Sequence, residues 1–273
     1  MPAIQLARLK IQVTDLLAYF SEPIEFLREL HTMLDFYADR TRRSGQSGKP
    51  KPLIQAYNVP QQVMRRIESD IAPLVAAGPE DALLLGDQLW LDAWYESRLL
   101  AIAILGMLPP DPIDLIVERL QAWGRDCREN VLLDALLDKG ATPFLTEHPD
   151  EYFFFVENML TSGNLPSRKI GLKAMPALIQ NPEFENLPAL YRLLSPLVRE
   201  SASALETDII QVVRTLGQRS PQETAYFLQK NLNSPHKSGL SIITRQSLDV
   251  FPPELGETLR TVLRESLRIS NGA

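Results

Sequence analysis

The chain has 273 residues, of which 45% are apolar and 23% charged, and its formal net charge is −6 at pH 7. This length and apolar content allow a sizeable core, whereas a single cysteine excludes an internal disulfide and any metal site built from several cysteines. The negative charge argues weakly against a general nucleic-acid binder, because non-specific affinity for DNA comes mainly from neutralised phosphates.

The N-terminus, MPAIQLARLKIQVTDLL, mixes apolar and charged residues and lacks the basic and apolar regions of a signal peptide. No apolar run approaches the roughly 20 residues that cross a bilayer. We therefore expect a cytoplasmic protein with no membrane partner.

Two different segments follow near the N-terminus. Residues 24–40 carry apolar side chains at spacings of three and four, which predicts an amphipathic helix. Residues 41–52, TRRSGQSGKPKP, are rich in Gly, Ser, Pro and positive charge and predict a basic, mobile loop. We expect residues 1–40 to form helices that pack on or cap the remainder of the chain.

Prolines then recur along the chain at intervals of 32 to 39 residues. Each opens a segment with helical periodicity, where the missing N–H of proline costs nothing. These residues are Pro112, Pro149, Pro188, Pro221 and Pro253.

Another apolar-periodic segment lies between successive proline-led segments, so each interval holds two helices. Such a period is typical of HEAT-like or armadillo-like repeats, in which neighbouring helix pairs stack to bury their apolar faces. The sequence therefore predicts an all-α solenoid over residues 53–270, with a concave wall that binds partners. The alternative is an irregular helical bundle.

The stretch QAWGRDCREN combines a tryptophan, an aspartate and the only cysteine. A structural interpretation ends one helix near Trp123, with Gly124 after it, and begins another at Asp126, with Glu129 completing a capping box. A functional interpretation has Trp123 offer a ring face to a nucleotide and Asp126 a carboxylate to a developing cation. Cys127 is expected to be a buried, unreactive filler.

Two other stretches carry candidate binding residues. Trp90 and Trp94 are four positions apart, which would place them on one helical face as core or as a stacking platform. Arg168, Lys169 and Lys173 lie near the start of a predicted helix, where cations oppose the helix dipole; they fit phosphate contacts or a solvated face.

The sequence lacks the motifs of metal sites and of other common classes of enzyme. His31, His148 and His236 are scattered and have no metal-ligand spacing with one another or with the cysteine. There is no phosphate-binding loop, dinucleotide fingerprint or nucleophile elbow. We therefore expect no metal and no small-molecule cofactor.

Four stretches resemble, in order, the HEAT-like repeat DNA glycosylases that excise alkylated purines, the AlkD-like family. The resemblance covers roughly residues 50–200 of the chain. The stretches are AYNVPQQVMRRIESDI, LGDQLWLDAWYESRLLAIAIL, AWGRDCRENVLLDALL and SGNLPSRKIGLKAMPALI.

The resemblance implies duplex DNA on the concave wall and hydrolysis of the glycosidic bond to an N3- or N7-alkylated purine. It places Trp123 and Asp126 at the damaged nucleotide, although they are three positions apart where the family has four. Basic residues of the mobile loop and of the later helices would contact phosphates. They are Arg42, Arg43, Lys49, Lys51, Arg168, Lys169 and Arg214.

A second hypothesis belongs to another class of protein, a non-enzymatic repeat scaffold that binds a protein or peptide partner. It is favoured by the acidic balance of the chain, since fold alone does not imply function. A continuous basic stripe on the binding wall would favour DNA, and an acidic or apolar groove would favour a protein.

Overall fold

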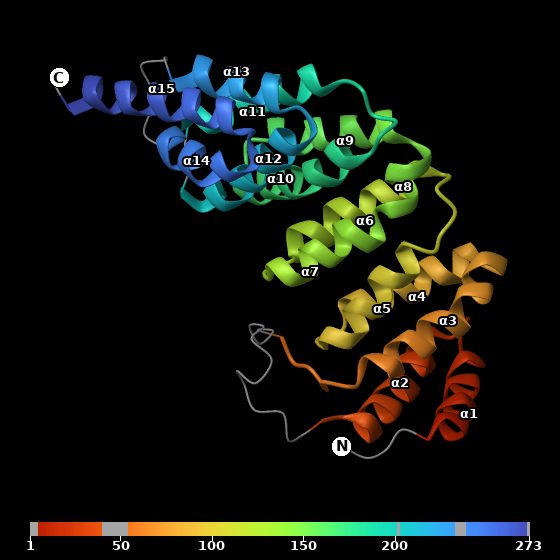
Figure 1. The fold of residues 1–273 in the computed structure, drawn as a ribbon. Helices are drawn as coiled ribbons and strands as arrows, with labels where there is room; N and C mark the ends of the chain where they lie inside the picture. Colours follow the sequence, from red (N-terminus) through yellow and green to blue (C-terminus); the bar gives the residue numbers. More distant parts are fainter. Residues whose placement is uncertain (1–4, 40–53, 201–202, 233–238, 272–273) are drawn as a thin grey trace. The chain divides into compact units, whose positions relative to one another are not determined.

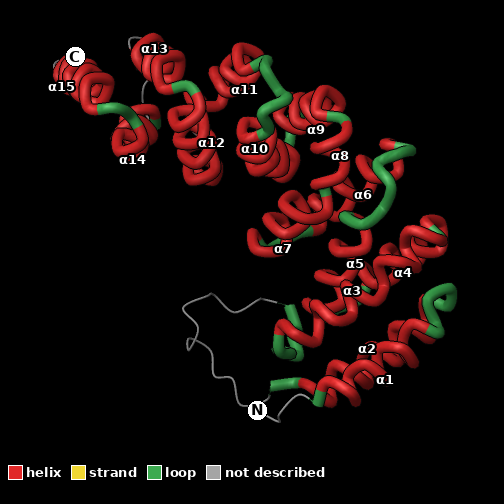
Figure 2. Tube along the Cα trace, turned by 45° about the vertical axis from the view of Figure 1, so that its right-hand side comes forward, coloured by secondary structure: helices red, strands yellow, loops and turns green. Residues whose placement is uncertain are grey.

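A computed structural model describes residues 5–39, 54–200, 203–232 and 239–271, with the side chains of residues 267–271 left out. In this part of the chain the structure is all-α: helices α1 to α15 follow one another, and no strand is present (Figure 2). The predicted basic loop, residues 41–52, lies outside the described residues.

The chain divides into two compact units, residues 1–147 and 148–273. The first unit contains α1 to α8 and a short π-helical turn, Leu136–Gly140, between α7 and α8. Its helices are α1 (Leu6–Leu17), α2 (Pro23–Tyr37), α3 (Gln61–Ala77), α4 (Pro79–Leu91), α5 (Tyr95–Leu105), α6 (Ile113–Asp126), α7 (Asn130–Ala135) and α8 (Thr142–Glu147).

The second unit contains α9 to α15 (Figure 1). Two 3₁₀ turns, Ser203–Leu205 and Leu248–Val250, precede α12 and α15. Its helices are α9 (Pro149–Thr161), α10 (Leu165–Gln180), α11 (Leu187–Glu200), α12 (Glu206–Arg219), α13 (Pro221–Leu232), α14 (Leu240–Ser247) and α15 (Pro253–Asn271).

Within each unit a helix packs against its neighbour in sequence and against the helix two positions further on. In the first unit α1 packs on α3, α2 on α4 and α3 on α5. In the second, α9, α11 and α13 form one layer and α10, α12 and α14 the other (Figure 1). This arrangement is a helical-repeat fold, in which the apolar face of each helix pair is buried by the next pair.

Proline marks the start of many helices, as predicted. Pro149 is the first residue of α9, Pro221 of α13 and Pro253 of α15, while Pro188 is the second residue of α11. Pro112 instead lies one position before α6, as its N-cap residue. The fixed φ of proline suits the first helical turn, so these local signals could be found without knowledge of the tertiary structure.

The interface between α9 and α10 is close enough to require a glycine. A Cβ atom on Gly171 would lie 2.8 Å from Cγ and Cδ2 of Leu160 and 3.1 Å from Cβ of Met159. The side chains of Leu160 and Met159 are themselves buried. A larger residue at position 171 would therefore force the two helices apart.

We expect Gly171→Val to lower the free energy of unfolding by about 2 kcal/mol, because overpacking a close helix interface has a cost of this order. Denaturant unfolding followed by circular dichroism measures the change. Gly163→Val is the matched control, since no atom lies within 4 Å of a Cβ at this exposed position. Equal effects of the two substitutions would contradict the close contact.

Candidate functional site in the first unit

An extended segment, residues 54–60, is fixed against the helices of the first unit by two glutamates. The buried carboxylate of Glu96 accepts hydrogen bonds from the backbone N–H groups of Tyr57, at 3.0 Å, and Asn58, at 2.7 Å. Glu129 accepts one from the N–H of Ile54 at 2.9 Å. These charge-assisted bonds determine where the Tyr57 side chain lies.

The Tyr57 ring stacks on Trp94, in the turn between α4 and α5. Their ring centroids are 3.8 Å apart and the planes are inclined by 15°. The backbone supports this pairing, because the N–H of Tyr95 donates to the carbonyl of Gln55. Both rings are partly exposed, so the stack offers aromatic surface at the edge of the unit.

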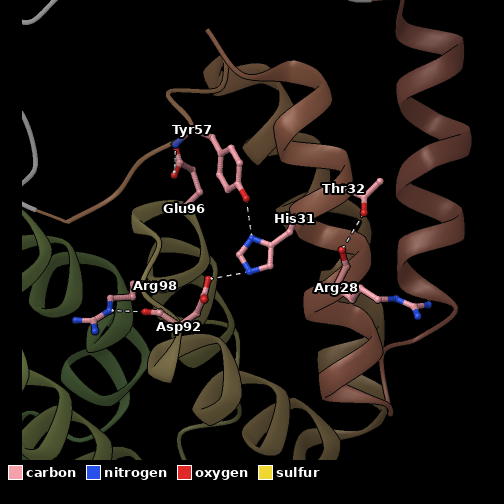
Figure 3. Close-up of polar contacts among 7 residues, drawn as sticks. All are labelled: Arg28, His31, Thr32, Tyr57, Asp92, Glu96 and Arg98. Carbon is pink, nitrogen blue, oxygen red and sulfur yellow. Dashed lines mark hydrogen bonds and ion pairs between the residues drawn. The ribbon is translucent and has the colours of Figure 1, made fainter. Parts of the chain in front are cut away.

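His31 of α2 lies between Tyr57 and Asp92 (Figure 3). Its Nδ1 is 3.0 Å from the Tyr57 hydroxyl, and its Nε2 is 3.3 Å from Oδ2 of Asp92. The contact between Nε2 and Asp92 lacks hydrogen-bond geometry. It is an ion pair only when the imidazole is protonated, because a neutral imidazole carries no charge. Burial raises the pKa of Tyr57, and the carboxylates of Asp35, Asp92 and Glu96 raise it further, which keeps the hydroxyl neutral.

Arg98 of α5 connects this group to Asp126. Its Nε donates to the backbone carbonyl of Asp92 at 3.1 Å (Figure 3), and its Nη1 donates to Oδ2 of Asp126 at 3.3 Å. The guanidinium also lies over the Trp90 ring, 5.1 Å from its centroid. We refer to the connected residues His31, Tyr57, Asp92, Trp94, Arg98 and Asp126 as the His31 cluster.

Asp126 is the accessible carboxylate of the His31 cluster, because its side chain is 54% exposed whereas that of Asp92 is 13% exposed. Glu96 is 4% exposed and both its oxygens accept backbone hydrogen bonds. The pairing with Arg98 holds one oxygen of Asp126 in place. Only Asp126 among these acids can thus approach a bound molecule without rearrangement.

Trp123 lies in the core beneath this carboxylate. It is 5% exposed and stacks on Trp90, with ring centroids 4.8 Å apart and planes inclined by 4°. The predicted contact between the Trp123 ring and a nucleotide does not fit this burial. Trp123 instead supports Trp90, and through it the guanidinium of Arg98.

Trp90 and Trp94 do not share a helical face, contrary to the expectation from their spacing. Helix α4 ends at Leu91, and the extended backbone of Asp92 separates Trp90 from Trp94 before α5 begins. As a result Trp90 turns into the core, while Trp94 stacks on Tyr57.

The predicted helix boundary in QAWGRDCREN is also wrong. Helix α6 continues to Asp126, so Gly124 lies inside the helix and Asp126 is its last residue. Glu129 precedes α7, but its carboxylate binds the N–H of Ile54 and makes no capping bond. A tertiary hydrogen bond has thus replaced the local capping box.

Cys127, which follows Asp126, has a protonated thiol. Burial raises its pKa to about 12, and the carboxylates of Asp126, Glu129 and Asp134 add to the effect, while Arg98 opposes it. A thiol is a nucleophile only as the thiolate, so this raised pKa disfavours reaction of Cys127 at neutral pH, although the residue is half-buried and not the fully buried filler that the sequence predicts.

The predicted phosphate-contacting residues differ in whether the structure describes them and whether they form ion pairs. Arg42, Arg43, Lys49 and Lys51 lie outside the described residues.

In the second unit Arg168 pairs with Glu200 at 2.9 Å, and both terminal nitrogens of Arg214 pair with Asp249 at 2.5 and 2.7 Å. Lys169 makes no ion pair with any residue that the structure describes. Lys173, considered with them, pairs with Asp208.

Sequence reasoning missed two exposed cations beside Asp126. Arg125 and Arg128 are both exposed, and neither forms an ion pair within the described ranges. They belong to the stretch QAWGRDCREN, in which the sequence predicts nucleotide contacts for Trp123 and Asp126 alone. The available signal is the charge of RDCR itself, two arginines to one aspartate, which gives this helix end a local positive balance.

The described residues offer neither a metal site nor a membrane-spanning helix. No group of three or more His, Cys, Asp or Glu side chains is arranged to hold a metal ion there. Nor is any helix in these ranges long and apolar enough to cross a membrane.

The fold and the site define a helical-repeat protein in which Arg98 links an accessible carboxylate to the turn that carries a stacked aromatic pair. Residues 32–246 match the profile of a family described as DNA alkylation repair enzyme. This match spans most of the chain, so the chain belongs to the DNA alkylation repair family, and the resemblance found in the sequence is confirmed. Comparisons with curated proteins and with solved structures each gave no match.

We expect Glu96→Gln to reduce the free energy of unfolding by about 2 kcal/mol, because an amide has one acceptor oxygen and leaves a second buried N–H unpaired. Glu129→Gln is the control, since Glu129 accepts a single backbone bond that an amide oxygen can keep. Urea titration of both variants measures the difference. The anchoring role of Glu96 would be refuted by equal losses.

We also expect Cys127 to resist alkylation. With a pKa of about 12 rather than the ordinary 9.0, the thiolate fraction is about a thousandfold lower at neutral pH. The rate of reaction with iodoacetamide in the folded chain should therefore be far below the rate in urea, as measured by mass spectrometry. Similar rates in both states would show that the thiol is accessible and ionised.

Proposed function

We propose that the chain binds duplex DNA and hydrolyses the glycosidic bond of N3- or N7-alkylated purines at the His31 cluster. The observation that carries the proposal is the geometry of Asp126. In a chain of the DNA alkylation repair family, an exposed carboxylate is held by Arg98, which also binds the carbonyl of Asp92, two residues before Trp94 of the aromatic stack.

The chemistry of an alkylated purine matches this set of groups. Alkylation at N3 or N7 puts a positive charge on the base, so the base leaves as a neutral molecule with the electrons of the glycosidic bond and needs no general acid. Positive charge then develops on the sugar, and water adds to C1′ with loss of a proton to solvent. An ionised carboxylate stabilises that charge electrostatically.

The residues of the His31 cluster have different roles in this reaction. Asp126 faces the sugar, and the partly exposed rings of Tyr57 and Trp94 contact the cationic nucleotide through their π faces. Arg98 orients Asp126 through its Nη1 donor. Trp123, buried against Trp90, is a positioning residue that supports Arg98 and does not touch DNA.

Phosphate contacts in the first unit are assigned to Arg125 and Arg128, which flank Asp126 and are exposed. Within the second unit Lys169 is the predicted contact whose charge is not already opposed by a described carboxylate. Arg168 and Arg214 would have to exchange Glu200 and Asp249 for phosphate. Arg42, Arg43, Lys49 and Lys51 remain candidates from the sequence.

We expect Asp126→Asn to lower the rate of N7-methylguanine release from duplex DNA by about a hundredfold, because the charge that stabilises the sugar cation is removed. Single-turnover assays with base detection by chromatography measure the rate. Asp114→Asn is the matched control, since Asp114 is an exposed acid at the other end of α6. Unchanged release by Asp126→Asn would refute the site, and no release by the wild type would refute the activity.

DNA binding is tested separately with a fluorescent duplex that contains or lacks N7-methylguanine. We expect binding to weaken steeply with salt, and Arg125→Glu with Arg128→Glu to weaken it by at least about tenfold, because phosphate contacts are lost. The control is Arg245→Glu on α14, which reverses an exposed charge far along the chain. Absence of binding even at low salt would exclude DNA as the partner and favour a scaffold.

A further inference from the structure

A second concave site lies in the second unit, between α11 and α13. It is a cavity of about 520 Å³, and its walls include Tyr191, Arg192 and Arg199 of α11 and Tyr226, Phe227 and Lys230 of α13. Both helices belong to the layer of α9, α11 and α13, whereas Lys169 and Arg214 belong to α10 and α12 of the other layer (Figure 1). We call this cavity the α11–α13 groove.

The base of the α11–α13 groove is aromatic and rigid. The rings of Tyr191 and Phe227 are 5.3 Å apart between centroids, and the Tyr191 hydroxyl is 2.7 Å from Oγ1 of Thr224, a buried residue. Tyr226, on the wall, is 67% exposed. Exposed and half-buried aromatic rings in one cavity are the usual anchors for an apolar side chain of a partner.

Three cations surround this aromatic base. The Nε of Arg199 donates to Oδ1 of Asn231 at 3.0 Å, and Asn231 is itself fixed by a bond from its Nδ2 to the carbonyl of Phe227. The asparagine is 2% exposed, so it holds the guanidinium in position, and among the described residues the two Nη groups of Arg199 have no hydrogen-bond partner. Arg192 and Lys230 complete the set.

Within the described part of the chain none of these three cations forms an ion pair, in contrast to Arg168, Lys173 and Arg214 of the same unit. The acid of the groove, Glu223, accepts a hydrogen bond from Ser220 at 3.0 Å at the start of α13. The groove is therefore locally positive on a chain whose net charge is −6.

We propose that the α11–α13 groove binds an acidic peptide segment of a partner protein, with one aromatic or aliphatic side chain on the aromatic base and carboxylates on Arg192, Arg199 and Lys230. The charges are complementary, and a guanidinium whose Nη groups are free matches a carboxylate in bidentate geometry. This inference does not depend on the proposed glycosylase function, because it concerns other residues in another unit.

A nucleic-acid strand fits the groove less well. Its affinity would come from many phosphate contacts along a continuous basic track, whereas the groove has three cations around a cavity of limited length. The volume of about 520 Å³ is that of a pocket for a few side chains. The aromatic base also contributes most when an apolar side chain is buried on it.

The test uses the full chain and a fluorescein-labelled peptide of acidic residues interrupted by one leucine and one phenylalanine. We expect saturable binding by anisotropy that weakens with salt. A peptide with amides in place of carboxylates, and one with serine in place of the two apolar residues, should each bind at least about tenfold more weakly, because charge and anchor both contribute.

The variant Arg192→Glu with Lys230→Glu should lose at least about tenfold in peptide affinity, and Tyr226→Ala a similar factor, because these side chains form the walls. All three are exposed, and circular dichroism verifies that the variants remain folded. Arg245→Glu, which reverses an exposed charge on α14 outside the groove, is the control and should bind as the wild type does.

Three outcomes would overturn the proposal. The first is that the peptide fails to bind with a Kd below about 1 mM, which marks the weakest useful affinity. The second is that the variant Arg192→Glu with Lys230→Glu binds the peptide as well as the wild type does. The third is that an oligothymidine binds the wild type more tightly than the peptide does, and that this variant abolishes the oligothymidine binding. The last would identify a single-strand site instead. Release of N7-methylguanine is measured on the same variants and should be unchanged, so failure here is distinguishable from failure of the proposed function.

Discussion

The buried carboxylate of Glu96 determines the position of much of the first unit's candidate site. Burying an isolated charge is costly, but Glu96 accepts two backbone N–H bonds and lies in the first turn of α5, where the helix dipole favours negative charge. The same two hydrogen bonds fix the backbone at Tyr57 and Asn58, where Asn58 adopts a positive φ of 56°. This backbone position brings the Tyr57 ring onto Trp94, where the two rings stack.

From Tyr57, which Glu96 fixes, a series of contacts leads through four further segments of the chain to Asp126. Tyr57 meets His31 of α2, His31 meets Asp92 after α4, and Arg98 of α5 joins Asp92 to Asp126 at the end of α6. Each residue is positioned by a partner distant in sequence, and the Trp90 and Trp123 stack supports the guanidinium from below. The accessible carboxylate thus depends on the packing of the whole repeat and not on its own helix alone.

The sequence predicts what is decided locally. Helical periodicity and proline at helix starts identify the helices and the repeat, because both effects act within one or two turns. Prediction from the sequence fails where a residue distant in the sequence determines the contacts of a side chain. Glu129 has the spacing of a capping box but binds Ile54, and Trp90 and Trp94 have the spacing of a helical face but are separated by the break at Asp92. His31 and Tyr57 belong to one site, yet no pattern in the sequence joins them.

Charge along the sequence is likewise a poor guide to which cations are available for a ligand. Arg168 and Arg214 seemed equivalent to Lys169 as phosphate contacts, but Glu200 and Asp249 already oppose their charges, and Arg214 also donates to the carbonyl of Gln246. A phosphate that binds Arg214 must replace a bidentate carboxylate, whereas one that binds Lys169 displaces no carboxylate of the described residues.

Two surfaces in the described part of the chain carry several cations without a carboxylate partner among the described residues. Arg125 and Arg128 flank Asp126 in the first unit, and Arg192, Arg199 and Lys230 surround the aromatic base of the α11–α13 groove in the second. An unpaired cation loses less on binding an anion, because no existing ion pair is broken. The availability of its cations, and not their number, therefore makes each of these two surfaces suited to an anionic partner.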